Sequence, residues 1–454
     1  MDHSQDISKG DTFISVNGGC SYLSKKQSDI LNHILILDPK EKKESKYIDI
    51  SNHKKDYLFQ IEEAYGFREM DFNKFFVTGT NGKTTTVHLL SQMLFFSNNS
   101  NASSGTLGIF LNNQFQKAQR LTTETPIYIR NFLHDCFSNK IENILFEASS
   151  IGLQENRLTG LTVDHAALSN ISRDHLDYHG TFANYVSSKI ELARLCKGTF
   201  TYVKEDEISD LINKSFHGNK LYSAAINDAR ADINLSIKKI YRDGMIDFHA
   251  DTPWGSCQNS VKLFADYNLL NLFLGLPYYM SCCDNIELFF EKIPELKLPT
   301  GRLQLFEKNN KKIFIDFAHT PQALEKTLIS IKKMKPKRII LVFGAGGERD
   351  QGKRNQMGEV AEKYADQLII TADNPRNENP KSISEMIIKT LSKNSNYEVE
   401  NNRKKAIKRA FASLGVNEIL LIAGKGHENY QIIEGRKEKF SDIEEVKRCL
   451  KLLD

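Results

Sequence analysis

The stretch KFFVTGTNGKTTT, residues 74–86, decides the fold of the central part of this 454-residue chain. Lys74 to Val77 is a short apolar run that predicts a buried strand. A loop rich in glycine and threonine follows, and beyond it apolar residues recur at helical spacing, at positions 87, 89, 90, 93 and 94. Strand, loop and helix in this order are the context that a phosphate-binding loop requires.

The loop itself has the chemistry to bind phosphate. Its glycines let backbone N–H groups approach phosphate oxygens, and the start of the helix adds a favourable dipole. Lys83 supplies a positive charge, and the hydroxyl of Thr84 can hold Mg2+. A glycine-rich turn with an exposed lysine is the alternative, but lysine and threonine directly after the last glycine favour the phosphate loop. The expected nucleotide contacts are Gly79, Thr80, Asn81, Gly82, Lys83, Thr84 and Thr85.

Composition and charge limit the class of protein. The length suggests about two to four domains, and we expect three. Hydrophobic residues make up 40% of the chain and charged residues 26%, as in soluble globular proteins. The 61 basic and 57 acidic residues leave a net charge of +4 that is spread along the chain. Nucleic acid is therefore not indicated as the main partner.

Neither a secretion signal nor a membrane span is visible in the sequence. Residues 1–19 are polar and carry three aspartates, unlike the basic start and apolar run of a signal peptide. No later stretch approaches the ~18 uninterrupted apolar residues of a membrane span. The seven cysteines are scattered and include no C-x-x-C pair, which favours a reducing compartment and opposes a structural zinc site. We expect a cytoplasmic monomer without membrane insertion.

The chain divides by pattern into an α/β protein of three domains. Ile144 to Ala148 and His165 to Leu168 predict buried strands that end in polar residues, and ligands bind at such strand ends in open α/β sheets. Residues 223–264 alternate apolar and polar side chains and suggest a few antiparallel strands before a helix near Leu269. We expect a small N-terminal α/β domain over 1–72, a central domain with a mainly parallel sheet plus antiparallel strands over 73–299, and a C-terminal Rossmann-like α/β domain over 300–454.

The C-terminal region alternates strand and helix patterns, which is typical of a doubly wound α/β domain. In its first predicted helix, Leu324, Leu328 and Ile331 form one apolar stripe with Met334. Strands are predicted at 313–317, 338–343, 368–372 and 419–423, and helices at 321–334, 353–365, 382–391 and 403–414.

Two candidate metal ligands follow the buried strands of the central region. Glu147 lies in FEASS, residues 146–150, and His175 lies in NISRDHLDYHG, residues 170–180. A carboxylate and an imidazole at neighbouring strand ends can hold Mg2+ beside the γ-phosphate of ATP. A lone carboxylate is more often a cap or a surface charge, and a lone histidine is more often structural. Beside a phosphate loop we interpret the two as functional.

Together these motifs resemble the Mur ligase family, which also includes folylpolyglutamate synthases. GTNGKTTT resembles the family's phosphate loop, in which the first glycine of the common loop is absent, and Val77 stands at that position here. The resemblance runs from about Asp71 to the C-terminus and implies an ATP-dependent ligase. It implies that Mg2+ is held by Thr84, Glu147, His175 and a carbamylated Lys189. From the residues alone, Lys189 in the predicted helix 182–195 would be a solvated lysine.

The resemblance extends the ATP site into the linker and the third domain. The string YNLLN at 267–271 is similar to the family's F-N-x-x-N, whose asparagines contact ATP, although helix caps or turn residues are the alternative. The arginine of PTGR, residues 299–302, matches one that contacts phosphate, and the acid of DFAHTP, residues 316–321, matches one that holds the ribose. The implied ATP contacts here are Asn268, Asn271, Arg302, Asp316 and His319.

Four strings narrow the resemblance to the members that add diaminopimelate. They are TTETP at 122–126, GAGGERDQGKR at 344–354, DNPR at 373–376 and AGKGHENYQ at 423–431. Diaminopimelate is lysine with an extra carboxylate, and an arginine fork binds a carboxylate through two N–H bonds. The resemblance implies that Arg376 selects this carboxylate, although DNPR alone could be a turn. The implied pocket is Arg349, Asp373, Asn374, Pro375, Arg376, Gly424 and Glu428.

The resemblance also implies UDP-N-acetylmuramoyl-L-alanyl-D-glutamate as the acceptor. The segment HSQ at 3–5 with GDTFISV at 10–16 looks like a worn form of the family's uridine-binding motif, so we expect a shortened UDP-sugar-binding domain. The chain departs from the family's pattern at Ile151, Glu155, Ala265 and Gln304, which affects acceptor binding rather than ATP chemistry. The implied acceptor contacts are Ser4, Thr122, Thr123, Ser149, Glu155 and Arg157.

The implied reaction has two steps. The γ-phosphoryl group of ATP moves to the D-glutamate carboxylate, and an amine of meso-2,6-diaminopimelate then attacks the acyl phosphate. Positioning and electrostatics would do most of the work, and the expected catalytic residues are Lys83, Glu147, His175, Lys189 and Arg302.

Four rival interpretations remain at this point. A ligase for lysine or another diamino acid and a folylpolyglutamate synthase are opposed by the DNPR and GKGHE strings. A nucleotide-binding switch or a catalytically inactive partner protein would keep Lys83 and lose the metal and amino-acid residues, which are all present. A DNA-binding ATPase would want a basic face, which the composition does not show.

Overall fold

The computed structural model describes residues 12–15, 33–36, 47–49 and 57–451. The first three described segments are β1 (Thr12–Ser15), β2 (His33–Ile36) and β3 (Tyr47–Asp49), which form a parallel sheet in the order β1-β2-β3. The predicted uridine contact Ser4 lies outside the described residues. The role of the N-terminal domain therefore stays a prediction.

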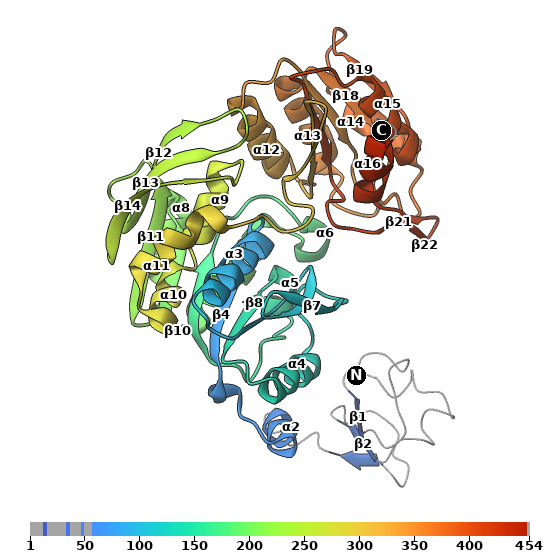
Figure 1. The fold of residues 1–454 in the computed structure, drawn as a ribbon. Coiled ribbons are helices and arrows are strands. Elements are labelled where there is room, and N and C mark those ends of the chain that lie inside the picture. The colour runs from blue at the N-terminus through green and yellow to red at the C-terminus, as the bar shows by residue number, and fades with distance from the viewer. Residues whose placement is uncertain (1–11, 16–32, 37–46, 50–56, 452–454) are drawn as a thin grey trace.

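The central region contains an eleven-stranded mixed sheet (Figure 1). Its order is β14-β13-β12-β11-β10-β9-β4-β8-β5-β6-β7, parallel from β12 to β5 and antiparallel at both ends. The strands are β4 (Asn73–Thr78), β5 (Asn101–Gly105), β6 (Gly108–Leu111), β7 (Gln114–Lys117), β8 (Asn143–Glu147), β9 (Val163–Leu168), β10 (Cys196–Val203), β11 (Lys220–Ile226), β12 (Ile233–Ile240), β13 (Ile246–Thr252) and β14 (Gly255–Val261).

Helices cover this sheet and connect its parallel strands. A short 3-10 helix, Glu69–Asp71, precedes β4. The helices are α2 (Tyr57–Tyr65), α3 (Lys83–Phe96), α4 (Pro126–Ser138), α5 (Ser150–Gln154), α6 (Leu176–His179), α7 (Phe182–Leu195), α8 (Asp206–Ser215), α9 (Asp266–Phe273), α10 (Leu276–Cys283) and α11 (Ile286–Lys292).

The strand order reverses at β4, and this reversal positions the phosphate loop. β4 pairs in parallel with β8 on one side and β9 on the other, so the chain leaves β4 between two neighbouring strand ends. Ligands bind at such a switch point in open α/β sheets. The loop between β4 and α3, the end of β8 and the end of β9 therefore open at one edge of the sheet.

The C-terminal region contains a six-stranded sheet in the order β15-β16-β20-β17-β18-β19, parallel except for the edge strand β15. A separate two-stranded hairpin, β21-β22, follows β20. The strands are β15 (Gln304–Lys308), β16 (Lys311–Asp316), β17 (Ile339–Phe343), β18 (Gln367–Ile370), β19 (Tyr397–Val399), β20 (Ile419–Ala423), β21 (Tyr430–Ile433) and β22 (Arg436–Lys439). The helices are α12 (Pro321–Lys333), α13 (Gly352–Tyr364), α14 (Pro380–Ile388), α15 (Arg403–Ser413) and α16 (Asp442–Lys451).

Local sequence explains where three of these helices start. The side chains of Thr320, Asn379 and Asn402 each accept a hydrogen bond from a backbone N–H in the first turn of the helix that follows. Proline occupies the first position of α12 and of α14, where its missing N–H costs no helical hydrogen bond. These caps place the C-terminal ends of the preceding strands beside the helix starts.

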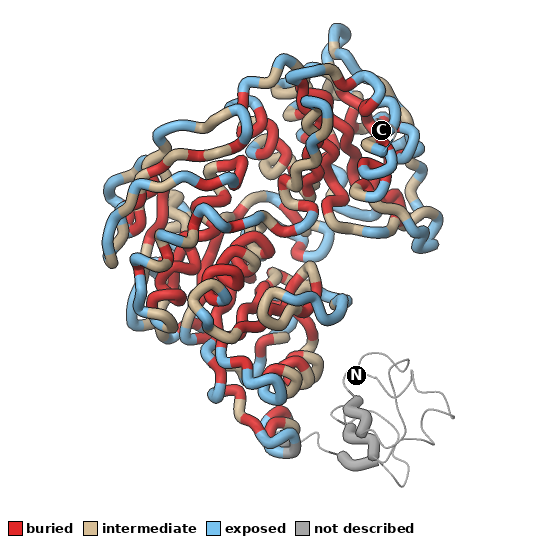
Figure 2. The backbone as a smooth tube through the Cα atoms, in the orientation of Figure 1, coloured by how far each residue is buried: buried red, intermediate tan, exposed pale blue. Residues whose placement is uncertain are grey.

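Apolar residues fill both faces of the C-terminal sheet (Figure 2). In β17, Leu341 and Phe343 enter one core, whereas Ile340 and Val342 enter the other. Alternate side chains of a strand point to opposite faces, so a strand that is apolar throughout indicates burial on both sides. The central sheet likewise lies between two apolar cores. Two rigid sheets thus carry the loops that form the site.

The predicted α/β class is confirmed, and each of the four strands and four helices predicted for the C-terminal region has an observed counterpart. The strands β15, β19, β21 and β22 and the helix α16 were not predicted. Over 223–264 the sequence predicts antiparallel strands, and β12, β13 and β14 are antiparallel neighbours. The first strand of that segment, β11, instead pairs in parallel with β10 and β12. Within the described residues, no helix is both long enough and apolar enough to cross a membrane. The domain bounds at 72 and 299 stay predictions.

Candidate active site

The phosphate loop approaches its neighbours so closely that two of its glycines have no room for a side chain. A Cβ added to Gly79 would lie 1.9 Å from the Oγ of Ser169, and one added to Gly82 would lie 2.4 Å from the Oδ1 of Asn271. Both glycines also have positive φ, 148° and 90°. Gly82 caps α3 without any side-chain hydrogen bond, so the first N–H groups of α3 face the loop without a side-chain cap.

The end of β9 holds the loop in shape. The side chain of Asn170 accepts from the N–H of Asn81 at 3.1 Å and donates to its carbonyl at 3.0 Å. The carbonyl of Asn170 accepts from the N–H of Thr80 at 2.8 Å. The hydroxyl of Thr80 lies 2.8 Å from that of Tyr185 on α7. These bonds fix the loop before any ligand is present, which lowers the cost of organising it on binding.

Two buried lysines converge on one carbonyl of the loop. The Nζ atoms of Lys83 and Lys189 donate to the carbonyl oxygen of Gly79 at 2.7 and 2.8 Å. Burial lowers the pKa of Lys83, and burial together with the nearby Lys83 holds the pKa of Lys189 well below its usual value. Neither lysine has a carboxylate within salt-bridge distance among the described residues, so an anionic ligand would stabilise their charged forms.

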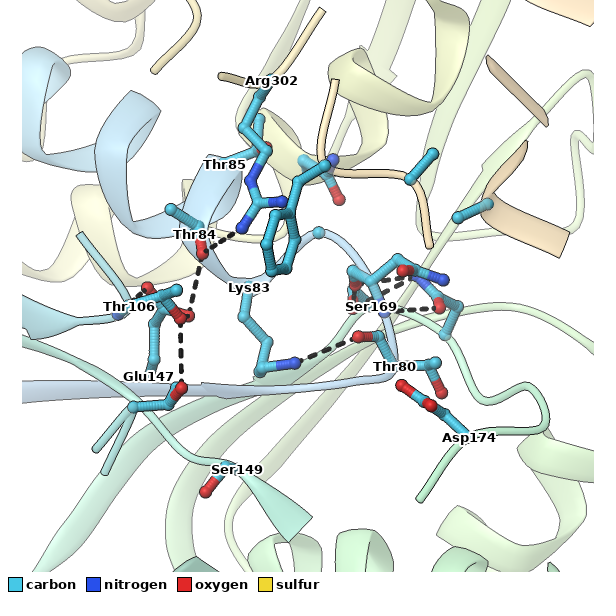
Figure 3. A pocket seen from close by; sticks show the side chains of 18 of the residues that line it. Thr80, Lys83, Thr84, Thr85, Thr106, Glu147, Ser149, Ser169, Asp174 and Arg302 are labelled. Carbon is cyan, nitrogen blue, oxygen red and sulfur yellow. Dashed lines mark hydrogen bonds between the residues drawn. The ribbon is translucent and has the colours of Figure 1, made fainter. Parts of the chain in front are cut away.

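Glu147 at the end of β8 lies beside the loop (Figure 3). Its carboxylate accepts from the hydroxyl of Thr84 at 3.0 Å, and from the N–H and hydroxyl of Thr106 at 2.9 and 3.0 Å. Arg302 lies on the other side of Thr84, with its Nη2 atom 3.4 Å from the same hydroxyl. The guanidinium of Arg302 also stacks on the ring of Phe317 at 4.1 Å. An arginine of the interdomain linker thus reaches the start of α3.

Asp174 joins the central region to the C-terminal region. Its carboxylate lies 3.5 Å from Nε2 of His175, 3.7 Å from Nε2 of His319 and 3.6 Å from Nζ of Lys353. Burial alone would raise the pKa of Asp174, but these partners hold it well below the usual value. His175 has a φ of 52°, and burial lowers its pKa to about 4. The imidazole of His175 is therefore neutral near pH 7, which is the form that can ligate a metal.

The predicted ribose contact Asp316 and the other predicted ATP contacts Asn268 and Asn271 line the same space. Asp316, at the end of β16, accepts from the N–H of Leu303 at 2.7 Å and from that of Ala318 at 3.0 Å. Burial raises the pKa of Asp316. On α9, Asn271 donates to the side-chain oxygen of Asn268 at 3.3 Å, so these two asparagines form one pair rather than separate helix caps.

A cavity of about 470 Å3 unites these elements from both sheets. Its volume suits a ligand of nucleotide size. The predicted residues that line it are Thr80, Asn81, Gly82, Lys83, Thr84, Thr85, Thr122, Glu147, Ser149, Arg157, His175, Lys189, Asn268, Asn271, Arg302, Asp316 and His319.

Three further predicted residues do not line the cavity but form hydrogen bonds with residues that do. Gly79 holds the two lysines through its carbonyl. Thr123 donates to the carbonyl of Glu147 at 2.8 Å and accepts from the N–H of Ser149 at 2.9 Å. Glu155 accepts from Nε of Arg157 at 2.9 Å and from the hydroxyl of Tyr178 at 2.9 Å. Arg157, the predicted acceptor contact, is thus already oriented at the rim.

The predicted amino-acid pocket forms a second cluster at the carboxyl edge of the C-terminal sheet. Asn374 donates to Oε2 of Glu428 at 3.0 Å. Lys425, which is fully buried, donates to Asn374 at 3.1 Å and to Glu428 at 2.8 Å. It also lies 3.5 Å from Asp373. The loops after β18 and β20 are therefore joined by a polar network.

Arg376 contacts that network only weakly among the described residues, with its Nη1 atom 3.4 Å from the carbonyl oxygen of Asn374. Its φ is 55°, and its Nη1 atom donates to the carbonyl of Gly347 at 2.6 Å. Among the described residues it has no salt bridge, although it is half-buried. Burial and the nearby Arg349 lower the pKa of Arg376. A half-buried arginine beside a second arginine is arranged for a carboxylate ligand.

Arg349 connects this cluster with the first. Its Nη1 atom lies 3.0 Å from Oδ2 of Asp177 on α6. Beside it, Arg173 forms a forked ion pair with Asp350, with N–O distances of 2.8 and 3.0 Å. In Figure 1, α6 lies between the central and C-terminal regions. Ion pairs between the segment around α6 and the loop before α13 therefore help to set the relative position of the two clusters.

The donor set fits a magnesium ion. Thr84 and Glu147 present oxygen atoms, which Mg2+ prefers, at the start of a phosphate loop. In the part of the chain that the structure describes, no three histidine, cysteine, aspartate or glutamate side chains gather into a metal site. The predicted set contains only Glu147 and His175 of these types. Phosphate oxygens and the predicted carbamate would have to complete it, so the metal ligands stay a prediction.

Several residues of the site were not foreseen from the sequence. Thr106, which holds Glu147, follows a polar strand and gives no sequence signal. Three more lie inside motifs that resemble the family, but their contacts join segments that are distant in the sequence. They are Asp174, Lys353 and Lys425. The one available signal was that charged residues follow the predicted strand ends.

Known protein families and curated proteins match this chain over most of its length. A model of the Mur ligase middle domain matches residues 77–276, and a model of the Mur ligase glutamate ligase domain matches residues 301–426. A curated UDP-N-acetylmuramoyl-L-alanyl-D-glutamate–2,6-diaminopimelate ligase of Rickettsia montanensis is 34% identical over 99% of this chain and 95% of its own length. Its namesake in Vibrio vulnificus is 30% identical over 98% of this chain and 93% of its own.

Solved structures of ligases also align with the whole chain. A structure of a UDP-N-acetylmuramoyl-L-alanyl-D-glutamate–2,6-diaminopimelate ligase aligns with a TM-score of 0.67 and 27% identity, over 100% of this chain and 94% of that one. A MurF ligase of Thermotoga maritima, solved in complex with ADP, aligns with a TM-score of 0.68 over 100% of this chain and 96% of that one. At 16% identity the second likeness concerns the fold alone.

Proposed function

The chain belongs to the Mur ligase family, as an ATP-dependent ligase of peptidoglycan synthesis, and from this premise we propose which amide bond it forms. The proposed reaction joins meso-2,6-diaminopimelate to the D-glutamate of UDP-N-acetylmuramoyl-L-alanyl-D-glutamate. Relatives with 30% to 34% identity over nearly the whole chain have names that state this reaction. The residues of the site support the same substrate.

The single observation that carries the proposal is the state of Arg376. Its guanidinium is half-buried beside Arg349, and no carboxylate of the described residues pairs with it. The far carboxylate of diaminopimelate would supply that partner. L-lysine lacks this group and would leave the guanidinium unpaired, at a cost of about 1–3 kcal/mol. Glu428, 3.0 Å from Asn374 at the other side of the cluster, suits the ammonium group.

The first step places residues of the phosphate loop around ATP. The N–H groups at the start of α3 and the ammonium of Lys83 would bind the β- and γ-phosphates. Arg302 would approach the γ-phosphate from the linker, and Asp316 would accept from a ribose hydroxyl. When bound at Thr84, Glu147 and His175, Mg2+ would neutralise charge on the phosphates. These groups favour transfer of the γ-phosphoryl group to the D-glutamate carboxylate.

The second step needs the amine beside the acyl phosphate. Arg157 at the cavity rim would hold the acceptor, and the pocket around Arg376 would present the amine of diaminopimelate. Attack on the carbonyl carbon forms a tetrahedral intermediate, from which phosphate leaves as the amide forms. Because the two clusters lie on different sheets, ion pairs such as Arg173–Asp350 would set their separation during the reaction.

Product analysis tests the proposed reaction. The purified chain is incubated with ATP, Mg2+, the UDP-linked dipeptide and meso-diaminopimelate, and the UDP-linked product is weighed by mass spectrometry. We expect one diaminopimelate residue to be added for each ADP released. Release of ADP without a heavier product would contradict the proposal, and omission of the UDP-linked dipeptide serves as the control.

The linker that carries Arg302 offers a prediction of its own. On α3, the side chain of Gln92 donates to the carbonyl of Lys297 at 2.8 Å and accepts from its N–H at 3.1 Å. These two bonds fix the linker five residues before Arg302. Gln92→Leu removes both, so we expect the turnover number to fall about tenfold, because a small misplacement of a catalytic group is costly.

Steady-state phosphate release measures this effect. The matched control is Gln258→Leu, which changes an exposed glutamine on β14 and is expected to leave turnover unchanged. Thermal unfolding of both variants shows whether either has lost its fold. Turnover of the Gln92 variant equal to that of the wild type would refute the role of the linker anchor.

A further inference from the structure

Two loops at the carboxyl edge of the C-terminal sheet lie side by side. The first, here the glycine loop, is residues 344–350 between β17 and α13. The second, here the DNPR loop, is residues 373–378 between β18 and α14. β17 and β18 are parallel neighbours, so both loops leave the sheet at the same edge. They carry the two arginines of the proposed amino-acid pocket, Arg349 and Arg376.

Backbone contacts bring the two loops together. The N–H of Gly347 donates to the carbonyl of Asn374 at 2.9 Å. The carbonyl of Gly347 accepts from Nη1 of Arg376 at 2.6 Å. A Cβ added to Gly347 would lie 1.9 Å from the carbonyl oxygen of Pro375, so only glycine permits this approach. The position of the glycine loop therefore decides where the guanidinium of Arg376 points.

One ion pair holds the two loops at this separation. Arg354, in the first turn of α13, donates through Nη1 and Nη2 to the two carboxylate oxygens of Glu378 at 2.8 and 2.9 Å. Its Nη2 also donates to the carbonyl of Gly346 at 3.1 Å. The carboxylate of Glu378 additionally accepts from the N–H of Glu348. The pair thus contacts both loops at once.

The burial and geometry of this pair make it rigid. The side chain of Arg354 is 1% exposed and that of Glu378 is 24% exposed. An arginine fork on a carboxylate fixes both the distance and the plane of the two groups, which a lysine cannot do. Neither residue is among the expected diaminopimelate contacts. They reach the pocket through Gly346 and Glu348, and the hydrogen bond from Arg354 lowers the pKa of Glu378, with a smaller contribution from the charge of Arg376.

We propose that Arg354 and Glu378 are positioning residues that set the choice of the amine substrate. By fixing the two loops relative to each other, they hold Arg376 where its free donors meet the far carboxylate of diaminopimelate. This inference rests on the proposed function, because it concerns the selectivity of the same pocket. It adds a determinant that lies outside the pocket and leaves the ATP site unaffected.

Glu378→Gln tests the inference with a variant of nearly the same shape. The amide presents an N–H2 group toward Arg354 in place of an acceptor, so one arm of the fork is lost. We expect the kcat/KM ratio of diaminopimelate over L-lysine to fall about tenfold, with the KM for ATP unchanged within about twofold. If Glu378 only stabilised the fold, the variant would change the KM for ATP as well as that for diaminopimelate, or it would change only the unfolding temperature.

Glu418→Gln is the matched control. Glu418 accepts from Nη2 of Arg338 at 2.8 Å, in an arginine–glutamate pair just before β17 and β20, at the opposite edge of the same sheet. We expect this variant to keep the selectivity of the wild type. Equal loss of selectivity in both variants, or no loss in the Glu378 variant, would overturn the inference.

A second measurement does not depend on the substrate. In Glu378→Ala, hydrogen exchange of the Gly347 and Glu348 amides should accelerate, because both lose the support of the pair. Exchange in β20 should stay as in the wild type. Unchanged exchange at Gly347 and Glu348 would overturn the inference whatever amine the protein uses. A wild type without preference for diaminopimelate would instead contradict the proposed function.

Discussion

Lys83→Met is expected to lower the rate of phosphate release about a hundredfold to a thousandfold. The ammonium of Lys83 stands inside the phosphate loop, where its Nζ atom is held 2.7 Å from the Gly79 carbonyl and 3.1 Å from that of Thr80. Methionine fills a similar volume but offers no charge to the oxygens that gain negative charge during transfer. The turnover number at saturating substrates measures this effect.

The same variant should remain folded. Burial lowers the pKa of Lys83, which means that the buried charge is disfavoured, so its removal should not lower the free energy of unfolding. Lys117→Met is the control, because Lys117 is exposed and pairs with Asp135 away from the cavity. If the Lys83 variant keeps more than about a tenth of the wild-type rate, the assignment of the loop is wrong.

Arg376→Gln is expected to lower kcat/KM for meso-diaminopimelate about tenfold to a hundredfold. The guanidinium would lose its forked contact with the far carboxylate, and glutamine can replace only part of it. The rate with L-lysine should not fall, because lysine has no group that meets this side chain. The ratio of the two kcat/KM values is therefore the quantity to measure.

L-lysine serves as the internal control for this variant. An equal fall with both amines would show that Arg376 supports the loop rather than the substrate. The backbone of Arg376 also holds this loop, because its N–H donates to the carbonyl of Ile432 at 2.9 Å and its carbonyl accepts from the N–H of Glu434 at 2.7 Å. Both bonds are retained in the glutamine variant, so a loss confined to diaminopimelate would identify the side chain.

The ATP side of the site could be predicted from the sequence because its parts are local. A strand, a glycine loop and a helix stand next to each other in residues 74–96, and the strand ends at Glu147 and Asn170 open at the same sheet edge. The clear alternation beyond residue 310 likewise reflects strands that are buried on both faces. In such regions, hydrophobic pattern and tertiary structure agree.

Other elements could not be predicted because their burial does not follow hydrophobic pattern. β5 has the polar sequence NASSG, yet all five residues are buried. Its backbone pairs with β6 and β8, and Ser91 donates to the side chain of Asn101 at 2.5 Å, so the polar groups are satisfied. The edge strands β15 and β19 are short and partly exposed, so they have little apolar signal.

Contacts between distant segments could not be predicted from the sequence either. Asp174 is adjacent to the predicted ligand His175, but its approach to Lys353 joins residues 179 positions apart, which no local pattern encodes. Arg354 ends a string that resembles the family, and Glu378 lies two residues beyond another. Their pairing appears only when β17 and β18 lie side by side. The sequence thus predicted candidate residues of the site, whereas the contacts that support these residues appear only in the folded structure.

In the proposed reaction, the C-terminal sheet selects diaminopimelate for an acyl phosphate that forms at the central sheet. The most direct test is the rate of phosphate release by the wild-type protein with ATP, Mg2+ and UDP-N-acetylmuramoyl-L-alanyl-D-glutamate, compared between meso-diaminopimelate and L-lysine. A half-buried arginine without a carboxylate partner among the described residues predicts a kcat/KM that is at least about tenfold higher for diaminopimelate. Equal values for the two amines, or a higher value for L-lysine, would contradict the account.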